Sequence, residues 1–244
     1  MQSNYEIRKT ARQGLSENWG AGVGVTLLYF VLTLLIPTIS GALDNIFNTG
    51  FDIGAIHTGV ITIIINWTVM SLLAVGFMWI FLDFVRGNDL NAEKLFQAFT
   101  SKISGKLIIA YILYMVYIIL WSLLFIIPGL IKSFSYSQTF YILRDNPDLS
   151  ANEAITLSRK MMGGNKENLF CLGLSFIGWV ILSVFTLGIG FLWLAPYAYT
   201  SFALFYENVK KQYENAGGNV GTPQSSTAQI TNDSYNPNKL PNDF

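Results

Sequence analysis

The feature that most constrains this chain is a series of apolar runs that carry little or no charge and are long enough to cross a membrane. The first goes from Trp19 to Ile39. As a helix it would extend about 31 Å at 1.5 Å per residue, which matches the roughly 30 Å hydrocarbon core of a bilayer. Only 12% of the residues are charged and 52% are hydrophobic, whereas a soluble domain averages about 25% charged residues. The sequence therefore predicts an all-α integral membrane protein.

The apolar runs predict six transmembrane helices arranged as three hairpins. They cover residues 19–39, 54–81, 107–127, 130–143, 169–185 and 189–206. The fourth run is the weakest, because a helix over it would extend only about 21 Å and because it contains Lys132 and several hydroxyl and amide side chains. It is either a short crossing or a re-entrant segment, and the distribution of charge has to decide between them.

The distribution of positive charge favours the crossing. If all six runs cross and both termini are cytoplasmic, every one of the 15 lysines and arginines except Lys132 lies in a cytoplasmic segment. Cytoplasmic loops of membrane proteins carry such an excess of lysine and arginine. Without a fourth crossing, Arg144, Arg159, Lys160 and Lys166 would all move to the outside. We therefore predict a multi-pass protein with cytoplasmic N- and C-termini.

A short amphipathic helix is predicted on the cytoplasmic surface before each hairpin. Two of these helices begin with the capping-box pattern S-x-x-E, at Ser3 and Ser150, and the third begins at Asn91, which is a favoured N-cap residue. Each has one apolar face, which is typical of helices that lie in the membrane interface. The predicted faces are Ile7, Ala11 and Leu15; Ala92, Leu95, Phe96, Phe99 and Ile103; and Ala151, Ala154, Ile155, Leu157, Ser158, Met161 and Met162.

The repeated order of amphipathic helix and apolar hairpin divides the chain into three similar units. Their bounds are 3–82, 89–143 and 150–208, within one six-helix membrane domain at 1–211. The second and third units begin alike, with Asp-Leu-Asn-Ala at 89–92 and Asp-Leu-Ser-Ala at 148–151. We interpret this pattern as an internal repeat; the alternative is that multi-span proteins commonly have amphipathic connectors. Residues 212–244 contain few hydrophobic side chains and are predicted to form a disordered cytoplasmic tail.

Patterns for catalysis, metal binding and cofactor binding are not found. The sequence contains no phosphate-binding glycine loop, nucleophile elbow or H-E-x-x-H motif. Its one cysteine, Cys171, and its one histidine, His57, have no neighbouring ligand residues in the sequence. The net charge of zero provides no basic field for nucleic acid. We therefore predict no enzyme activity, cofactor, metal ion or nucleic acid; the expected partners are membrane lipids and, as a second class, another membrane protein.

The remaining charges near the apolar runs are interpreted as ordinary helix-end charges. Asp83 and Arg86 are three residues apart at the end of the second run and are expected to pair with each other. Asp83 and Glu207 are both expected to be solvated at the cytoplasmic ends of their helices. No pair of acidic residues lies within the apolar runs, which argues against a carboxylate proton relay.

Five residues are candidates for contact with a lipid or a substrate. Lys132 is the one charge at the predicted membrane depth, where an ionisable residue is a functional hypothesis by default; near the outer edge, a lysine also extends to the headgroups. Ser135 and Gln138 either line a wet cavity with Lys132 or hydrogen-bond to neighbouring helices. Pro196, followed by Tyr197, is expected to kink the sixth run.

Several short motifs resemble one known family. They are Ile127-Pro128-Gly129, the stretch 133–138, Ala154 with Ser158 before Met162-Gly163, Phe176-Ile177-Gly178-Trp179, Gly188-Ile189-Gly190, Pro196-Tyr197 and, near the N-terminus, Asn18-Trp19. Over roughly Tyr5–Val209 the chain resembles domain of unknown function 975. The resemblance implies a six-span protein of the plasma membrane of Gram-positive bacteria, and it brings no established catalytic residues.

The leading hypothesis is a non-enzymatic membrane protein that acts through lipid or protein contacts, in envelope maintenance or in resistance to membrane-active peptides. It follows from the three predicted interfacial helices and from the missing catalytic groups. The alternative is a transporter or lipid-translocating protein whose pathway is lined by the fourth and sixth helices.

Overall fold

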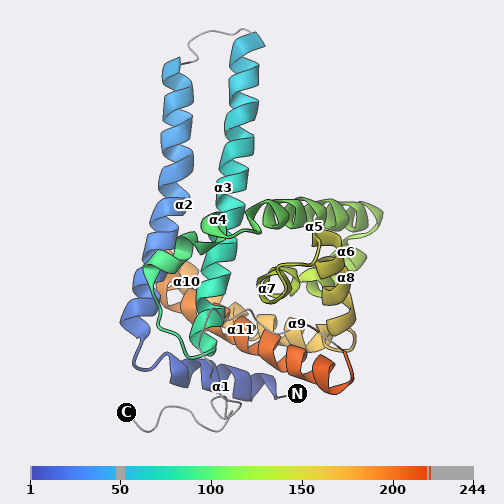
Figure 1. The fold of residues 1–244 in the computed structure, drawn as a ribbon. Helices are drawn as coiled ribbons and strands as arrows, with labels where there is room; N and C mark the ends of the chain where they lie inside the picture. The colour runs from blue at the N-terminus through green and yellow to red at the C-terminus, as the bar shows by residue number, and fades with distance from the viewer. Residues whose placement is uncertain (1, 48–52, 219, 221–244) are drawn as a thin grey trace.

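The computed structural model describes residues 2–47, 53–218 and 220, with the backbone alone for 47 and 53–58. Two long helices, α2 (Trp19–Phe47) and α3 (Ile53–Val85), lie side by side and extend well beyond the remainder of the molecule (Figure 1). Every described element is a helix, so the all-α prediction is confirmed.

The shorter helices surround the lower parts of α2 and α3 in Figure 1. They are α1 (Asn4–Gly14), the 3₁₀ helix η1 (Ala92–Phe96), α4 (Gln97–Thr100), α5 (Ser104–Leu124), α6 (Ile126–Tyr136), α7 (Thr139–Asp145), α8 (Ala151–Met161), α9 (Lys166–Leu174), α10 (Ile177–Phe185) and α11 (Phe191–Asn215). Because α11 continues to Asn215, the tail boundary predicted at 212 lies inside a helix. The rest of the predicted tail, from 221, and the side chain of His57 lie outside the described parts.

Within the described residues, four helical segments are long and apolar enough to cross a membrane, not six. They are 19–46, 59–85, 104–124 and 166–185. The predicted fourth crossing is divided between α6 and α7, and neither is long enough by itself. The predicted sixth crossing lies within α11, whose polar residues lower its mean hydropathy. The prediction of six transmembrane helices is therefore wrong by length and composition, whereas membrane association is supported.

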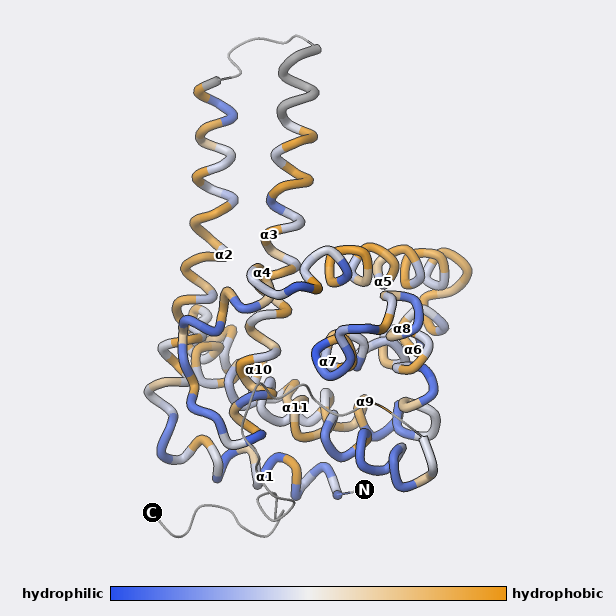
Figure 2. The backbone as a smooth tube through the Cα atoms, in the orientation of Figure 1, coloured by the Kyte–Doolittle hydropathy of each residue, from blue (hydrophilic) through white to orange (hydrophobic). Residues whose placement is uncertain are grey.

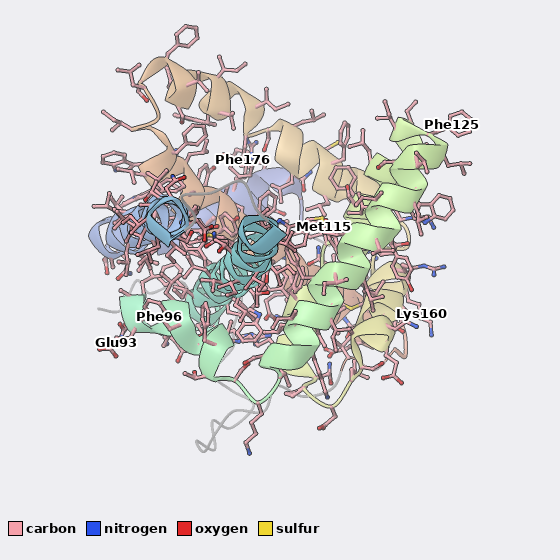
Figure 3. The ribbon with its side chains drawn as sticks, turned by 90° about the horizontal axis from the view of Figure 1, so that it is seen from above. Glu93, Phe96, Met115, Phe125, Lys160 and Phe176 are labelled. Carbon is pink, nitrogen blue, oxygen red and sulfur yellow. The ribbon has the colours of Figure 1, made fainter. Side chains whose placement is uncertain are left out.

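α5 runs across α2 and α3 rather than beside them. In Figure 1, α2 and α3 are upright and α5 lies along the width of the view. In Figure 3, which is turned by 90°, α2 and α3 are seen nearly end-on and α5 is again seen along its length. The helices on either side of Phe176, which are α9 and α10, are also seen lengthwise in that view. The apolar helices therefore do not form a parallel bundle.

α1 and α8 begin at the two predicted capping boxes. The Ser3 hydroxyl accepts a hydrogen bond from the Glu6 N–H at 3.2 Å, and the Glu6 carboxylate accepts one from the Ser3 N–H at 2.9 Å. Ser150 and Glu153 make the same pair of bonds at 3.3 and 2.8 Å. Each box satisfies N–H groups that would otherwise lack a partner at the helix start.

The predicted apolar faces of α1 and α8 are covered by other helices of the protein. Ile7 and Ala11 are buried where α1 packs on α11. Ala154 and Ser158 are buried where α8 packs on α5, α6 and α7. These two faces therefore stabilise the fold. Phe96 of η1 differs, because it remains 46% exposed and lies at the outer edge of the molecule in Figure 3.

Two glycine contacts position α3 and α2 against their neighbours. A Cβ at Gly76 of α3 would overlap the carbonyl oxygen of Leu95, so the glycine lets η1 lie directly on α3. On α2, a Cβ at Gly20 or Gly24 would meet no atom within 4 Å. Gly22 is the close position instead: its Cβ would lie 3.2 Å from the Cβ of Pro196 in α11.

Candidate functional site

A groove with a volume of about 250 Å³ lies where α5 crosses α3. Its walls are Ile63, Ile64, Trp67, Thr68 and Ser71 of α3 and Ile108, Tyr111 and Ile112 of α5. The Trp67 and Tyr111 rings meet edge to face, with their centroids 5.3 Å apart. We call this feature the α3–α5 groove.

The α3–α5 groove presents little polar surface. The Thr68 hydroxyl donates to the Ile64 carbonyl at 2.9 Å, and the Ser71 hydroxyl donates to the Thr68 carbonyl at 2.8 Å. Both hydroxyl donors are thus used within α3. A charged occupant would lose its hydration here without a replacement partner, whereas a hydrocarbon would lose nothing. The groove is also smaller than the roughly 300–1,000 Å³ of most ligand pockets, so it suits a single hydrocarbon chain.

The ends of α3 and α7 meet the second half of α11 in a group of charged side chains, which we call the charge cluster. Its members are Asp83, Arg86, Arg144, Asp145, Glu207 and Lys210, with Lys94 of η1 at its edge. The pairing between the ends of α3 and α7 is reciprocal. Asp83 pairs with Arg144 at 2.5 Å, and Arg86 pairs with Asp145 at 2.8 Å. Arg86 also binds Glu207 of α11 at 2.7 Å, so one guanidinium joins all three helices.

Asp145 is the centre of the charge cluster and is almost fully buried. Its carboxylate accepts hydrogen bonds from Arg86 at 2.8 Å, from the Tyr206 hydroxyl at 2.8 Å and from Lys210 at 2.7 Å. A buried carboxylate without partners would cost several kcal/mol. Three donors, two of them charged, offset that cost.

The electrostatics of the charge cluster favour the ionised forms of its central pair. Burial alone would raise the pKa of Asp145, but the hydrogen bond and charge of Arg86, together with Lys210, outweigh burial and lower it. Burial alone would lower the pKa of Arg86, but its hydrogen bonds and the charges of Asp145 and Glu207 outweigh burial and raise it. The central ion pair is therefore stable around neutral pH.

Arg144 is held by an aromatic ring as well as by Asp83. Its guanidinium carbon lies 4.9 Å from the centroid of Trp79, which is within the range of a cation–π contact. The Trp79 indole N–H donates to the Phe140 carbonyl at 3.0 Å, which orients the ring. Burial lowers the pKa of Arg144, although the charge of Asp83 opposes that effect.

The charge cluster corrects two expectations from the sequence. Asp83 and Arg86 do not pair with each other; each pairs with a residue of α7. Asp83 and Glu207 are not simple solvated helix ends, because their side chains are only 12% and 14% exposed and both bind arginines. Because each carboxylate is paired with a cation, the arrangement holds the ends of α3 and α7 against α11.

Lys132 lies on α6 against α5. Its Nζ is 4.3 Å from the centroid of the Trp121 ring. Arg159 of α8 and Lys166 of α9 are close enough to repel its charge. Lys132 therefore lies near residues that were predicted to be on the opposite side of the membrane.

Ser135 and Gln138 are buried and bonded to α8. The Ser158 hydroxyl donates to the Ser135 carbonyl at 2.8 Å and accepts from the Gln138 N–H at 3.2 Å. The Ser135 hydroxyl donates to the Ile131 carbonyl at 2.9 Å. The bonds to α8 therefore use the backbone groups of Ser135 and Gln138. Their side chains bond locally, since the Gln138 side-chain amide donates to the Ser137 hydroxyl at 2.8 Å.

Pro196 and Tyr197 do not face the helices that Lys132, Ser135 and Gln138 contact. Pro196 packs near Gly22 of α2, and the Tyr197 ring meets the Phe176 ring edge to face at 5.2 Å. Lys132, with the two residues bonded to Ser158, faces α5 and α8 instead. The structure thus separates the five candidates into two groups, and none of the five lines the α3–α5 groove.

Sequence reasoning found neither the groove nor the charge cluster. For the groove, the available signal was the interruption of the second run by Trp67, Thr68 and Ser71. For the cluster, it was the arginine that precedes each of the last two predicted units, Arg86 and Arg144. Neither signal predicts which residues complete the groove or the charge cluster, because those residues come from helices that are distant in the sequence.

The fold and these two features define a broad class, that of all-helical membrane-associated proteins. Within this class, the chain belongs to the family of proteins of unknown function DUF975, whose profile matches residues 1–135 and 123–213. The resemblance expected from the sequence motifs is thereby confirmed. Neither a curated protein nor a solved structure matches the chain.

Proposed function

We propose that this protein is a non-enzymatic lipid-contacting protein of a bacterial plasma membrane, with cytoplasmic termini. It would act in envelope maintenance or in resistance to membrane-active peptides. The observation that carries the proposal is the α3–α5 groove, which suits one acyl chain.

The surface around the groove supports a lipid occupant. Figure 2 shows hydrophobic residues along α5 and along the upper parts of α2 and α3. On α5, Ile109, Ile112, Val116, Ile119 and Leu123 are exposed at spacings of three or four residues, which is one face of the helix. Such a continuous apolar surface marks a site of contact with a membrane or a protein. An acyl chain in the groove would continue the surrounding hydrocarbon.

The proposal is tested by filling the groove. Ile112→Trp adds bulk inside the groove, and Ile119→Trp makes the same change on the same exposed face outside it. We expect native mass spectrometry of the purified protein to show about one fewer retained phospholipid for Ile112→Trp alone. A strain that carries only this variant should also become more sensitive to a cationic membrane-active peptide. Equal lipid retention by the two variants would contradict the proposal.

The transport alternative has less support. It requires α6 and α11 to line one pathway, but Lys132 faces α5 and Tyr197 faces Phe176. Lys132→Ala separates the two functions, since a lipid-contact protein tolerates this change and a pathway residue does not. Loss of peptide resistance in Lys132→Ala, with normal resistance in Ile112→Trp, would favour transport.

A further inference from the structure

The corner between α5 and α6 and the corner between α10 and α11 are both strongly apolar. At the first, Leu123 is 83% exposed and Phe125 is 69% exposed, and Phe125 lies at the outer end of α5 in Figure 3. At the second, Phe185 is 81% exposed and Leu187 is 94% exposed. A corner that reached water would expose these side chains at a cost of about 25 cal/mol per Å² of apolar surface.

The end of α2 has a different character. It carries Asp44, whose carboxylate accepts a hydrogen bond from Thr62 of α3 at 2.9 Å, and Asn45, which is exposed. By contrast, the segments 107–131 and 168–206, which contain the two apolar corners, have no charged residue. Among the described side chains at these three turning points, charge is found only at the end of α2, which suits the far aqueous phase.

The ends of each apolar segment return to the same place. Lys106, at the start of α5, donates to the Pro147 carbonyl just after α7 at 2.6 Å. Likewise, the N-terminal segment bonds to both ends of the second apolar segment. The Asn4 side chain donates to the Asn168 carbonyl at the start of α9 at 2.9 Å, and the Asn208 side chain of α11 donates to Gln2, just before α1, at 3.2 Å. Each segment therefore leaves and rejoins one surface of the molecule.

Charge placement becomes more consistent if these segments do not cross. Lys132 was the one cation outside the predicted cytoplasmic segments. In the structure its helix, α6, packs against α8 and α9, which carry Arg159 and Lys166. If α5 and α6 enter and leave the membrane on one side, Lys132 joins the other cations there, and the charge asymmetry loses its exception.

We infer that only α2 and α3 cross the bilayer, and that the α5–α6 and α10–α11 corners are embedded among the acyl chains of the cytoplasmic leaflet. In Figure 3, α2 and α3 are seen nearly end-on, whereas α5, α9 and α10 are seen along their length. In a bilayer that is crossed by α2 and α3, these helices therefore lie along the membrane plane. The two corners form a surface for one leaflet, and this inference does not depend on the occupant of the α3–α5 groove.

The test places a fluorescent probe at each turning point. In a Cys171→Ser background, single cysteines replace Asn45, Leu123, Phe185 or Lys160, all of which are exposed. Each is labelled with a nitrobenzoxadiazole group in right-side-out vesicles, and dithionite, which does not cross the membrane, is added outside. We expect bleaching at position 45 only. The probes at 123, 185 and 160 should bleach after the vesicles are permeabilised.

Bleaching at 123 or 185 at the rate seen for position 45 would overturn the inference, because it would place that corner at the outer surface. A second measurement needs no substitution. Polarised infrared spectroscopy of the full chain in aligned bilayers should show a low mean helix order along the membrane normal, since only α2 and α3 follow it. A strong alignment of most helices with the normal would also overturn the inference.

Discussion

Asp145 accepts three hydrogen bonds from residues that are distant in the sequence. The donors are Arg86, at the end of α3, and Tyr206 and Lys210, in the second half of α11. A buried ion pair contributes little net stability, yet removal of one partner leaves the others charged and unpaired. The charge cluster is therefore sensitive to single substitutions in a way that surface charges are not.

Asp145→Asn is expected to destabilise the protein by about 3–5 kcal/mol, because buried Lys210 would lose its counter-charge and Arg86 would keep only Glu207. The matched control is Asp148→Asn, at an exposed position three residues later, which should change stability by no more than about 0.5 kcal/mol. Unfolding of the full chain in detergent, followed by circular dichroism, measures both. Similar stability of the two variants would mean that the cluster is not a structural junction.

The lowered pKa of Asp145 predicts loss of stability in acid. A carboxyl group with a depressed folded pKa stabilises the protein above its ordinary value of 3.8 and loses that contribution as the pH falls through the folded pKa. The melting temperature of the wild-type chain should therefore fall below pH of about 4. The Asp145→Asn variant should show a shallower decline over the same range, and an identical decline would contradict the assignment.

At the scale of elements, close backbone contact decides which helices meet. η1 packs on α3 because Gly76 has no side chain to displace the Leu95 carbonyl. The α5–α6 and α10–α11 corners use a similar device. A Cβ at Gly129 would overlap Ser122, a Cβ at Gly190 would overlap Ser183, and the serine precedes the glycine by the same number of residues in both. This correspondence supports the proposal of an internal repeat.

Gly76→Ala is expected to destabilise the protein by about 1–3 kcal/mol, because the new methyl group would push η1 away from α3. Gly24→Ala is the control, since a Cβ there meets nothing within 4 Å. Both changes gain the same helix propensity, of up to about 1 kcal/mol, so the difference between them isolates the contact. Thermal unfolding in detergent is the measurement, and equal melting temperatures would argue against the close approach of η1.

Local signals in the sequence predicted some elements well. The capping boxes at Ser3 and Ser150 depend on residues three positions apart, and both are present as expected. The helix predicted from Asn91 was wrong in form, because a 3₁₀ turn and a single α turn fit against Gly76 instead. Ile155 and Met162 were assigned to an interfacial face and are buried in protein. An aspartate substitution at Ile155 or Met162 would therefore disturb folding, whereas Phe96→Asp, at an exposed position, would test lipid contact.

At the scale of the whole molecule, apolar composition predicted membrane association and helical structure. It did not predict whether each apolar helix runs across the bilayer or along it, and charge asymmetry does not supply this orientation either. A pair of helices that crosses the membrane twice and a re-entrant pair that does not cross it both return the chain to its original side. Arg144 and Arg159 therefore lie on the same side of the membrane in either arrangement. Only the position of Lys132, between the two helices of the pair, distinguishes them. The partners in the charge cluster were also unpredictable, because pattern and periodicity act over a few residues and these contacts join distant helices.

The ion pair between Arg86 and Glu207 has a consequence for the order of events during synthesis. Arg86 is made 121 residues before its partner Glu207. At roughly 5–20 residues per second, translation needs about 6–24 s to connect them. During that interval α3 is complete while its terminal arginine lacks the contact with α11. The cluster closes only when the last helix has been made, so its closure records that the whole membrane domain has left the ribosome.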